Sequence, residues 1–428
     1  MAEITPPETR RSTAQQRKRG DRQKKPAPGI AGKPSRTSGK RKGAGSAQPV
    51  PQANPGLGPK SGPKAVAKPS SKPAQKPVSE PSVALAPQRN LPLQRNSYAA
   101  IDLGTNNCRL LIARPSGGNF TVIDAFSRVV RLGEGLAQTG RLSEEAMDRA
   151  LGALKICAEK LKRRNVHLAR SVATEACRRA SNGDEFIQRV MRETGIRLDV
   201  ISAEEEARLA VLGCHILLEG GSGPAVIFDI GGGSTELVLI EQGGAIPHIV
   251  DWQSVPWGVV SLTETCGSDE STPEARRARY EDMHGRVRDS FAGFAERIAS
   301  ARTPELRLLG TSGTVTTLAS VHLDLPQYDR KAVDGLIVPA ASMREISTNL
   351  SRMSPAERRQ LPCIGNERAD LVVAGCAILE AILDIWPAPR LGVADRGIRE
   401  GILRSLISSD NEGEQARAAL RRAKRGRQ

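Results

Sequence analysis

The sequence predicts an α/β protein with two lobes of like topology, preceded by a basic tail. An apolar strand, an Asp-x-Gly turn and a second apolar strand surround Asp102, and the same unit recurs around Asp229. Short apolar runs alternate with segments of helical period between and after these units, which is typical of α/β folds. The composition also changes abruptly after Asn96. We therefore expect a tail at 1–95, a first lobe at 96–222, a second lobe at 223–408 and a short basic tail at 409–428.

The amino-terminal tail carries the whole formal charge excess. The 428-residue chain has a net charge of +16, and residues 1–96 alone hold 20 lysines and arginines against four acidic residues. They also hold 16 of the 28 prolines. Such a segment buries too little apolar surface to offset the entropy lost on ordering, so we expect disorder. The rest of the chain is close to neutral, which argues against a basic nucleic-acid-binding fold. The tail itself is expected to make nonspecific contacts with polyanions.

Several classes of protein are excluded by composition. No run of 18 apolar residues is present and Met1 is followed by polar residues, so we expect neither a membrane span nor a secretory signal. Seven cysteines without a CxxC pair predict reduced thiols and a cytoplasmic location. The five histidines are scattered, so a His/Cys metal site is not expected.

The first lobe should begin with two strands, at 98–101 and 108–113, around a tight turn. Ser143 is a candidate N-cap for the helix that follows. One face of this helix is apolar and consists of Leu151, Leu154, Cys157, Ala158 and Leu161. The remaining elements of the lobe are strands at 169–174 and 198–202, and helices near 184–194 and over 203–219.

The second lobe follows a flexible break at 220–224. Its opening strands should lie at 225–228 and 237–240, and a third strand at 306–309 should lead into a helix at 315–321. An apolar helix is expected at 369–385, and a last strand and helix within 392–407. This last helix is expected to return to the first lobe.

The Asp102 turn reads Asp-Leu-Gly-Thr-Asn-Asn. Gly104 permits the positive φ values of a tight turn, and successive backbone N–H groups in such a turn can cradle an anion. Thr105, Asn106 and Asn107 add uncharged donors. An acid beside a phosphate cradle requires a cation, and Asp102 could hold Mg²⁺ directly or through water. The alternative is an ordinary hairpin turn rich in Asp, Gly and Asn.

The Asp229 turn carries three consecutive glycines, Gly231, Gly232 and Gly233. Their entropic cost between two strands makes sense where another group approaches the backbone closely. Ser234 and Thr235 can donate to phosphate oxygens, and Glu236 adds a carboxylate. The expected metal set is Asp102, Asp229 and Glu236, with Mg²⁺ or Mn²⁺ as the ion.

A third acidic segment, Glu204 to Glu206, opens the helix predicted after residue 202. Acids stabilise helix N-termini, which is one explanation. The other is that a carboxylate at this junction orients and deprotonates water. Arg128, Arg131 and Arg368 are candidate clamps for a polyanion, or solvated side chains. No Walker A sequence, no GxSxG and no Ser-His-Asp set is visible.

Together these motifs resemble the exopolyphosphatase/guanosine pentaphosphate phosphohydrolase family, in its short two-domain form, over about residues 98–408. The first and second phosphate motifs of that family are similar to residues 102–109, which include Arg109, and 229–236. Segments 173–176, 309–314 and 367–370 are similar too. The resemblance implies two ribonuclease-H-like lobes of the actin-like ATPase superfamily with an interlobe cleft. It also implies that Glu206, just before Ala-Arg, is the catalytic glutamate.

The expected activity is attack of water on a terminal phosphoryl group, with Glu206 as base and the two turns binding successive phosphates. The substrate is inorganic polyphosphate or guanosine pentaphosphate, and the latter would connect the protein to the stringent response. The sequence does not choose between them, and a homodimer is a candidate assembly that it does not decide. Two rivals stay open, namely an ATP-dependent kinase of the same superfamily and a non-catalytic regulator that binds nucleotide or polyanion.

Overall fold

The computed structural model describes residues 96–117, 119–241, 243–244, 246–267 and 270–425. The predicted disordered tail at 1–95 lies outside these residues, so it stays a prediction. All of the elements below belong to one compact unit of the chain.

The first lobe is organised around a five-stranded sheet with the order β3-β2-β1-β4-β5. The strands β1, β2 and β3 pair antiparallel, whereas β4 and β5 continue the sheet in parallel with β1. Their bounds are β1 Ser97–Leu103, β2 Asn107–Ser116, β3 Asn119–Val129, β4 Val166–Ala173 and β5 Leu198–Val200. The hairpin expected around Asp102 is therefore confirmed, and β3 extends it.

The second lobe repeats this arrangement. Its sheet has the order β8-β7-β6-β9-β11, with β10 added antiparallel at the edge. The strands β6, β7 and β8 pair antiparallel, and β9 and β11 follow in parallel. Their bounds are β6 Ala225–Ile230, β7 Thr235–Glu241, β8 His248–Val255, β9 Arg307–Thr311, β10 Ile337–Pro339 and β11 Arg390–Ala394. The duplicated topology predicted from the repeated Asp-x-Gly unit is confirmed.

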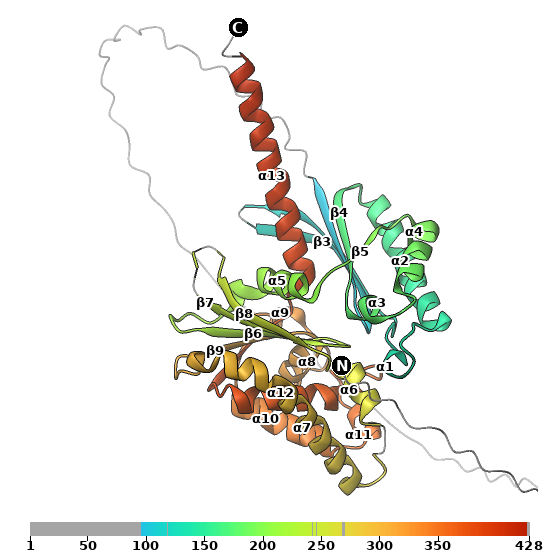
Figure 1. Ribbon diagram of the computed structural model, residues 1–428, viewed down its shortest axis with the longest axis vertical. Helices are drawn as coiled ribbons and strands as arrows, with labels where there is room; N and C mark the ends of the chain where they lie inside the picture. Colours follow the sequence, from blue (N-terminus) through green and yellow to red (C-terminus); the bar gives the residue numbers. More distant parts are fainter. Residues whose placement is uncertain (1–95, 118, 242, 245, 268–269, 426–428) are drawn as a thin grey trace, which may run out of the picture. The chain divides into compact units, whose positions relative to one another are not determined.

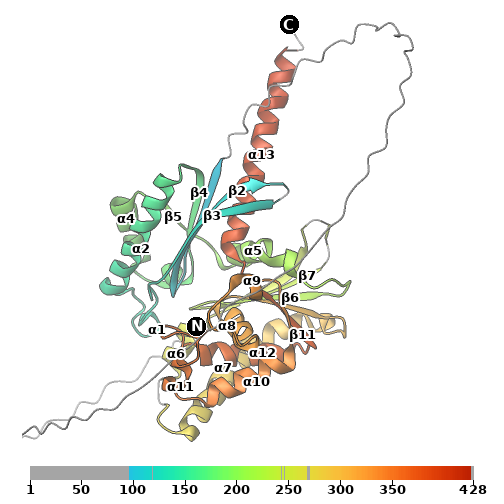
Figure 2. The same cartoon turned by 180° about the vertical axis from the view of Figure 1, so that it is seen from behind.

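Helices cover one outer face of each sheet (Figures 1 and 2). The first lobe has α1 Leu136–Thr139, α2 Glu144–Arg163, α3 Glu175–Arg179 and α4 Gly183–Thr194. As expected, Ser143 caps α2 by accepting from the Ala146 N–H at 3.2 Å. The second lobe has α6 Val259–Thr265, α7 Pro273–Arg297, α8 Gly313–His322, α9 Arg330–Val333, α10 Ala340–Arg352, α11 Pro355–Arg359 and α12 Val372–Ile385. Apolar residues of α7 and α12 form the larger core against this sheet.

Two helices join the lobes, α5 (Ala203–Cys214) and α13 (Ile398–Arg425). Ala207, Val211 and Cys214 of α5 pack on the second sheet, while its Leu209 packs with α13 on the first. The helices touch backbone to backbone, because a β-carbon at Gly401 would overlap the Leu209 carbonyl oxygen. This contact fixes the start of both helices beside the space between the sheets.

Two helix ends differ from the sequence expectation. The helix expected over 203–219 ends at Cys214 and gives way to a 3₁₀ turn at His215–Leu217, before the Gly-rich break. The last helix does not stop near residue 407, because α13 continues to Arg425. Tyr98 donates to Asp410 at 2.7 Å and so holds part of the segment expected to be a tail. No helix in the described part of the chain is long and apolar enough to span a membrane.

Candidate active site

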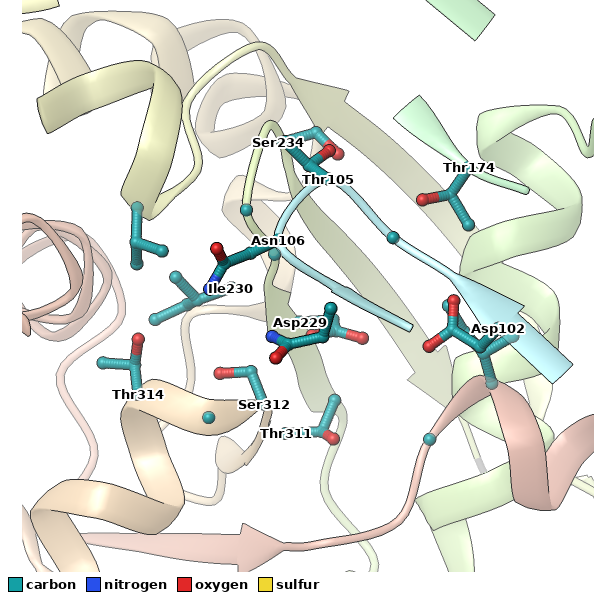
Figure 3. Close-up of a pocket in the computed structure, with 18 of the residues that line it drawn as sticks. Asp102, Thr105, Asn106, Thr174, Asp229, Ile230, Ser234, Thr311, Ser312 and Thr314 are labelled. Carbon is teal, nitrogen blue, oxygen red and sulfur yellow. The ribbon is translucent and has the colours of Figure 1, made fainter. Parts of the chain in front are cut away.

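A pocket lies where the carboxyl ends of the central strands of both sheets meet (Figure 3). Its wall comes from the two Asp-x-Gly turns, the starts of α3 and α5, the β9–α8 turn and the segment that enters α13. Asp102 at the end of β1 and Asp229 at the end of β6 both reach it. The duplicated fold thus brings two segments that are distant in the sequence to one site.

The first turn is closed by a hydrogen bond from the Gly104 N–H to the Asn107 carbonyl at 2.9 Å. The Asn106 carbonyl accepts from Val130 and Arg131, which ties the turn to the end of β3. Gly104 does not adopt a positive φ, so that part of the sequence interpretation is wrong. The buried Asn106 Oδ1 has no hydrogen-bond partner and remains an available acceptor in the pocket wall.

The second turn is packed tightly against the first. A β-carbon at Gly232 would lie 2.9 Å from Thr105 Cβ, and one at Gly233 would overlap Glu175 Oε2. The expectation of a close approach is confirmed for Gly232 and Gly233, where the approaching groups belong to the first lobe. A β-carbon at Gly231 would instead lie 2.9 Å from the Ser234 carbonyl oxygen of the same turn. Thr105 donates to Glu175 Oε2 at 3.0 Å, so Glu175 contacts both turns.

Three carboxylates of the pocket, Asp102, Asp229 and Glu236, form no ion pair with any residue that the structure describes. Burial raises the pKa of Asp229 to about 6 and that of Glu236 to about 7. Burial also raises the pKa of Asp102, against the nearby charges of Arg109 and Arg399. Glu236 Oε1 accepts from the hydroxyls of Ser234 and Ser254 at 2.7 and 2.9 Å. An anionic cluster this well buried calls for a positive group in the space it surrounds.

Glu206 is the one member of the three-glutamate run that reaches the pocket. Glu204 is exposed, and Glu205 pairs with Arg170 and Arg208 on the surface. The Ser202 cap sets this geometry by accepting from the Glu205 N–H. Glu206 Oε2 accepts from Arg178 at 3.1 Å. Burial, then the charge of Glu236, raises the pKa of Glu206 well above its ordinary value, which makes its ionised carboxylate a stronger base.

Two of the predicted arginines line the pocket, Arg109 from β2 and Arg368 from the segment before α12. Arg368 donates to Thr317 at 2.7 Å, and Arg109 makes no hydrogen bond or ion pair with any described residue. The other predicted phosphate-binding residues on the pocket wall are Gly104, Thr105, Asn106, Asn107, Gly231, Gly232, Gly233 and Ser234.

Three predicted residues do not line the pocket. Arg128 lies over the ring of Phe126, and Arg131 pairs with Glu367 at 2.8 Å. Thr235 is fully buried and donates to the Trp257 carbonyl at 2.6 Å. Successive side chains of a strand point to opposite faces, so Thr235, between Ser234 and Glu236, faces away from the site.

Four further residues of the pocket wall received no role from the sequence, namely Glu175, Ser312, Arg396 and Arg399, although Glu175 and Ser312 lie in segments that resemble the family. Glu175 is 5% exposed and pairs with Arg179 at 2.6 Å. Each of the four lies in a turn or a helix start just after a parallel strand. Ligands of α/β sheets bind at the carboxyl ends of such strands, so the strand-to-helix junctions themselves were the available signal.

The predicted Mg²⁺ ligands do not form a complete metal site by themselves. Within the described ranges, no three His, Cys, Asp or Glu side chains are gathered closely enough to hold an ion by themselves. Mg²⁺ commonly uses one or two carboxylates and completes its shell with water and substrate phosphates. The unpaired carboxylates and the orphaned Asn106 Oδ1 supply the oxygen donors that such an ion requires.

The fold and the site together define an α/β protein of two lobes with duplicated topology and one pocket lined by both phosphate-motif turns. Residues 111–410 match the model of the Ppx/GppA phosphatase family. The chain is also 33% identical to Exopolyphosphatase 2 of Mycobacterium tuberculosis over 326 residues, which covers 72% of this chain and 98% of that protein. The chain therefore belongs to the Ppx/GppA phosphatase family.

Solved structures of the family have the same architecture. A family member from Aquifex aeolicus is 30% identical and has a TM-score of 0.60, with 74% of this chain and 99% of that chain covered. An exopolyphosphatase from Cytophaga hutchinsonii is 26% identical and has a TM-score of 0.65, with 73% and 98% covered. The predicted fold class of two actin-like lobes is confirmed by these similarities.

Proposed function

We propose that the protein hydrolyses terminal phosphoanhydride bonds with Mg²⁺ and releases phosphate from inorganic polyphosphate. One observation carries this proposal. Among the described residues, the pocket carboxylates Asp102, Asp229 and Glu236 form no ion pair, and neither does the neighbouring Arg109 guanidinium. A metal–polyphosphate substrate complements both sets at once, because the ion neutralises the acids and the phosphate oxygens neutralise the arginines.

In the proposed reaction, Glu206 takes a proton from the attacking water. Arg178 holds its carboxylate by a 3.1 Å hydrogen bond, and the raised pKa makes that carboxylate a stronger base than an exposed glutamate. The backbone N–H groups of the two turns and the Arg109 guanidinium bind phosphate oxygens and stabilise the charge on the transferring group. Asp102, Asp229 and Glu236 would hold the metal ion, which supplies charge neutralisation when bound.

Polyphosphate is the favoured substrate because two of the similar proteins are named exopolyphosphatases. Guanosine pentaphosphate presents the same terminal anhydride and is the second candidate. A kinase would need an acceptor hydroxyl, and a regulator would bind without turnover. A buried carboxylate with a raised pKa beside the turns, as at Glu206, favours hydrolysis over binding alone.

The test is phosphate release from long-chain polyphosphate and from guanosine pentaphosphate, assayed side by side with Mg²⁺. ATP with candidate acceptors forms the third arm. We expect release from polyphosphate without any acceptor. Binding of both anions without release would refute the proposal in favour of a regulator, and transfer to an acceptor would refute it in favour of a kinase.

A further inference from the structure

The arginines of the pocket wall differ in their partners. Arg396 forms an ion pair with Asp334 at 2.7 Å, and Arg368 donates to Thr317 at 2.7 Å. Arg109 and Arg399 line the same pocket, yet neither makes a hydrogen bond or an ion pair with any residue that the structure describes. The resemblance to the family pointed to Arg109, whereas Arg399 has no assigned role.

An unpaired guanidinium in a partly buried cleft is unfavourable, because it loses water without gaining an anion. Other arginines close to the pocket avoid this loss. Arg178 pairs with Glu206 at 3.1 Å, and Arg330 pairs with Glu400 at 2.8 Å. Arg399 forms no such pair within the described residues, although its charge lowers the pKa values of nearby Asp102 and Glu400. Its hydrogen-bond donors are therefore available to an anion from outside the chain.

The start of α13 fixes the place of Arg399. Glu400 caps this helix by accepting from the Gly397 N–H at 3.0 Å, so the helix end already has its own carboxylate. The close contact of Gly401 with Leu209 sets the rotation of the helix. Arg399 is near enough to Asp102 to lower the pKa of that carboxyl. Arg109, which is paired with Asp102 across β1 and β2, lowers it too. The guanidinium groups of Arg109 and Arg399 thus both act on the Asp102 carboxyl at the end of β1 without forming an ion pair with it.

We propose that Arg399 binds a phosphate group of the substrate chain inside the pocket, together with Arg109. This inference rests on the proposed function and adds a binding residue to it. The chemistry is that of a planar guanidinium donating two parallel hydrogen bonds to two oxygens of one phosphate. Because Arg399 lies inside the pocket, it contacts the first few phosphates of any chain, so tripolyphosphate and long polyphosphate depend on it equally.

The experiment compares Arg399→Gln and Arg399→Lys with Arg417→Gln, which removes the same charge from an exposed position of the same helix. Kinetics are measured with tripolyphosphate and with long polyphosphate. Arg399→Gln should raise KM at least about tenfold for both substrates and change kcat less, since charge-assisted hydrogen bonds are strong. The KM of Arg399→Lys should lie between those of Arg399→Gln and the wild type. The KM of Arg417→Gln should stay within about twofold of the wild-type value.

Chemical rescue separates binding from a structural role. Methylguanidinium added to Arg399→Ala should lower the raised KM, because it replaces the missing guanidinium group. A variant whose KM had risen because its fold was damaged would not respond in this way. An unchanged KM in Arg399→Gln overturns the inference, as does an equal rise in Arg417→Gln. So does a normal KM with a raised Mg²⁺ requirement, because Arg399 would then act only through Asp102.

The inference can fail independently of the proposed function. If the wild type releases no phosphate, the proposed function fails, and calorimetric binding of tripolyphosphate then tests Arg399 alone. Weaker binding to Arg399→Gln than to the wild type supports the residue as a phosphate contact. Equal binding to both proteins refutes it.

Discussion

Glu206 derives its proposed role from its surroundings rather than from its type. Glu205, one residue earlier on the same helix, pairs with surface arginines that lower its pKa. Glu206 is buried, and burial raises its pKa while Arg178 keeps it in place. Adjacent glutamates on one helix turn thus differ in basicity because only one of them faces the cleft.

The variant Glu206→Gln should keep the fold and substrate binding but lose turnover, because an amide cannot accept the proton from water. Loss of a general base typically lowers kcat by about 10²–10⁴-fold. The measurement is kcat for phosphate release together with tripolyphosphate affinity, and exposed Glu204→Gln is the matched control. A variant that retains more than about a tenth of the wild-type kcat would show that another group is the base.

Site residues that belong to contiguous motifs could be predicted from the sequence, whereas isolated site residues could not. Asp102, Asp229 and Glu206 stand in runs of unusual composition, and all three reach the pocket. Arg399 stands in an ordinary segment, and Glu175 stands in a segment that resembles the family without a role of its own. Only the tertiary fold shows that both reach the site. Thr235 was wrongly predicted to bind phosphate, although the alternation of side chains along a strand could have placed it on the other face. The position of Arg131 could not be predicted in this way, because Arg131 itself has a positive φ.

The two phosphate turns act as one element because they are packed against each other. Glu175 connects them by accepting from Thr105 while lying against Gly233. No signal in the sequence predicts this contact, since composition indicates that a glycine permits close approach but not which group approaches. The structure identifies that group as a carboxylate of the other lobe.

The variant Gly233→Ala should lower phosphate release, because its methyl group would overlap Glu175 Oε2 and push the turns apart. The double variant Gly233→Ala with Glu175→Ala should recover part of the loss, since neighbouring residues are energetically coupled. Gly220→Ala, at a position with no atoms near its β-carbon, is the control. Strictly additive effects of the two substitutions on kcat/KM would contradict the proposed contact.

The helix α13 offers two glycines in opposite environments. Gly401→Ala should lower the free energy of unfolding by about 1–3 kcal/mol, because its β-carbon would overlap the Leu209 carbonyl. Gly413→Ala meets no atoms and should raise it by about 0.5–1 kcal/mol through helix propensity. Denaturant unfolding of both variants measures this difference, and a destabilising Gly413→Ala or a neutral Gly401→Ala would contradict the packing.

Over the whole molecule, the two lobes concentrate acidic groups at a place where they cannot all ionise freely. The balance between carboxylates and arginines in the pocket differs from that of the chain, whose excess of positive charge lies in residues 1–96. The duplicated topology could be predicted from the repeated turns. The return of the last helix to the first lobe was also expected and is confirmed by its packing on the first sheet. Its contact with α5 could not be predicted, because it depends on the close approach of Gly401 to the Leu209 carbonyl.

The metal-free protein should become more stable as pH falls from about 8 to about 6. The pKa values of Asp229 and Glu236 are about 6 and about 7 in the folded protein, above their ordinary values of 3.8 and 4.5. In this window the folded carboxyls take up protons that the unfolded chain does not, so protonation favours the folded state. Thermal unfolding in EDTA measures this slope, and Asp229→Asn should flatten it. Identical slopes for the variant and the wild type would contradict the buried cluster.

The central claim is that this pocket hydrolyses a terminal phosphoanhydride with help from a divalent ion. Phosphate release from long-chain polyphosphate by the full-length protein tests it most directly, first with Mg²⁺, then in EDTA, then after Mg²⁺ or Mn²⁺ is restored. We predict release, loss of release and recovery, because three unpaired carboxylates otherwise repel the anionic substrate. Full activity in EDTA, or binding of polyphosphate without release even when Mg²⁺ or Mn²⁺ is present, would contradict the claim.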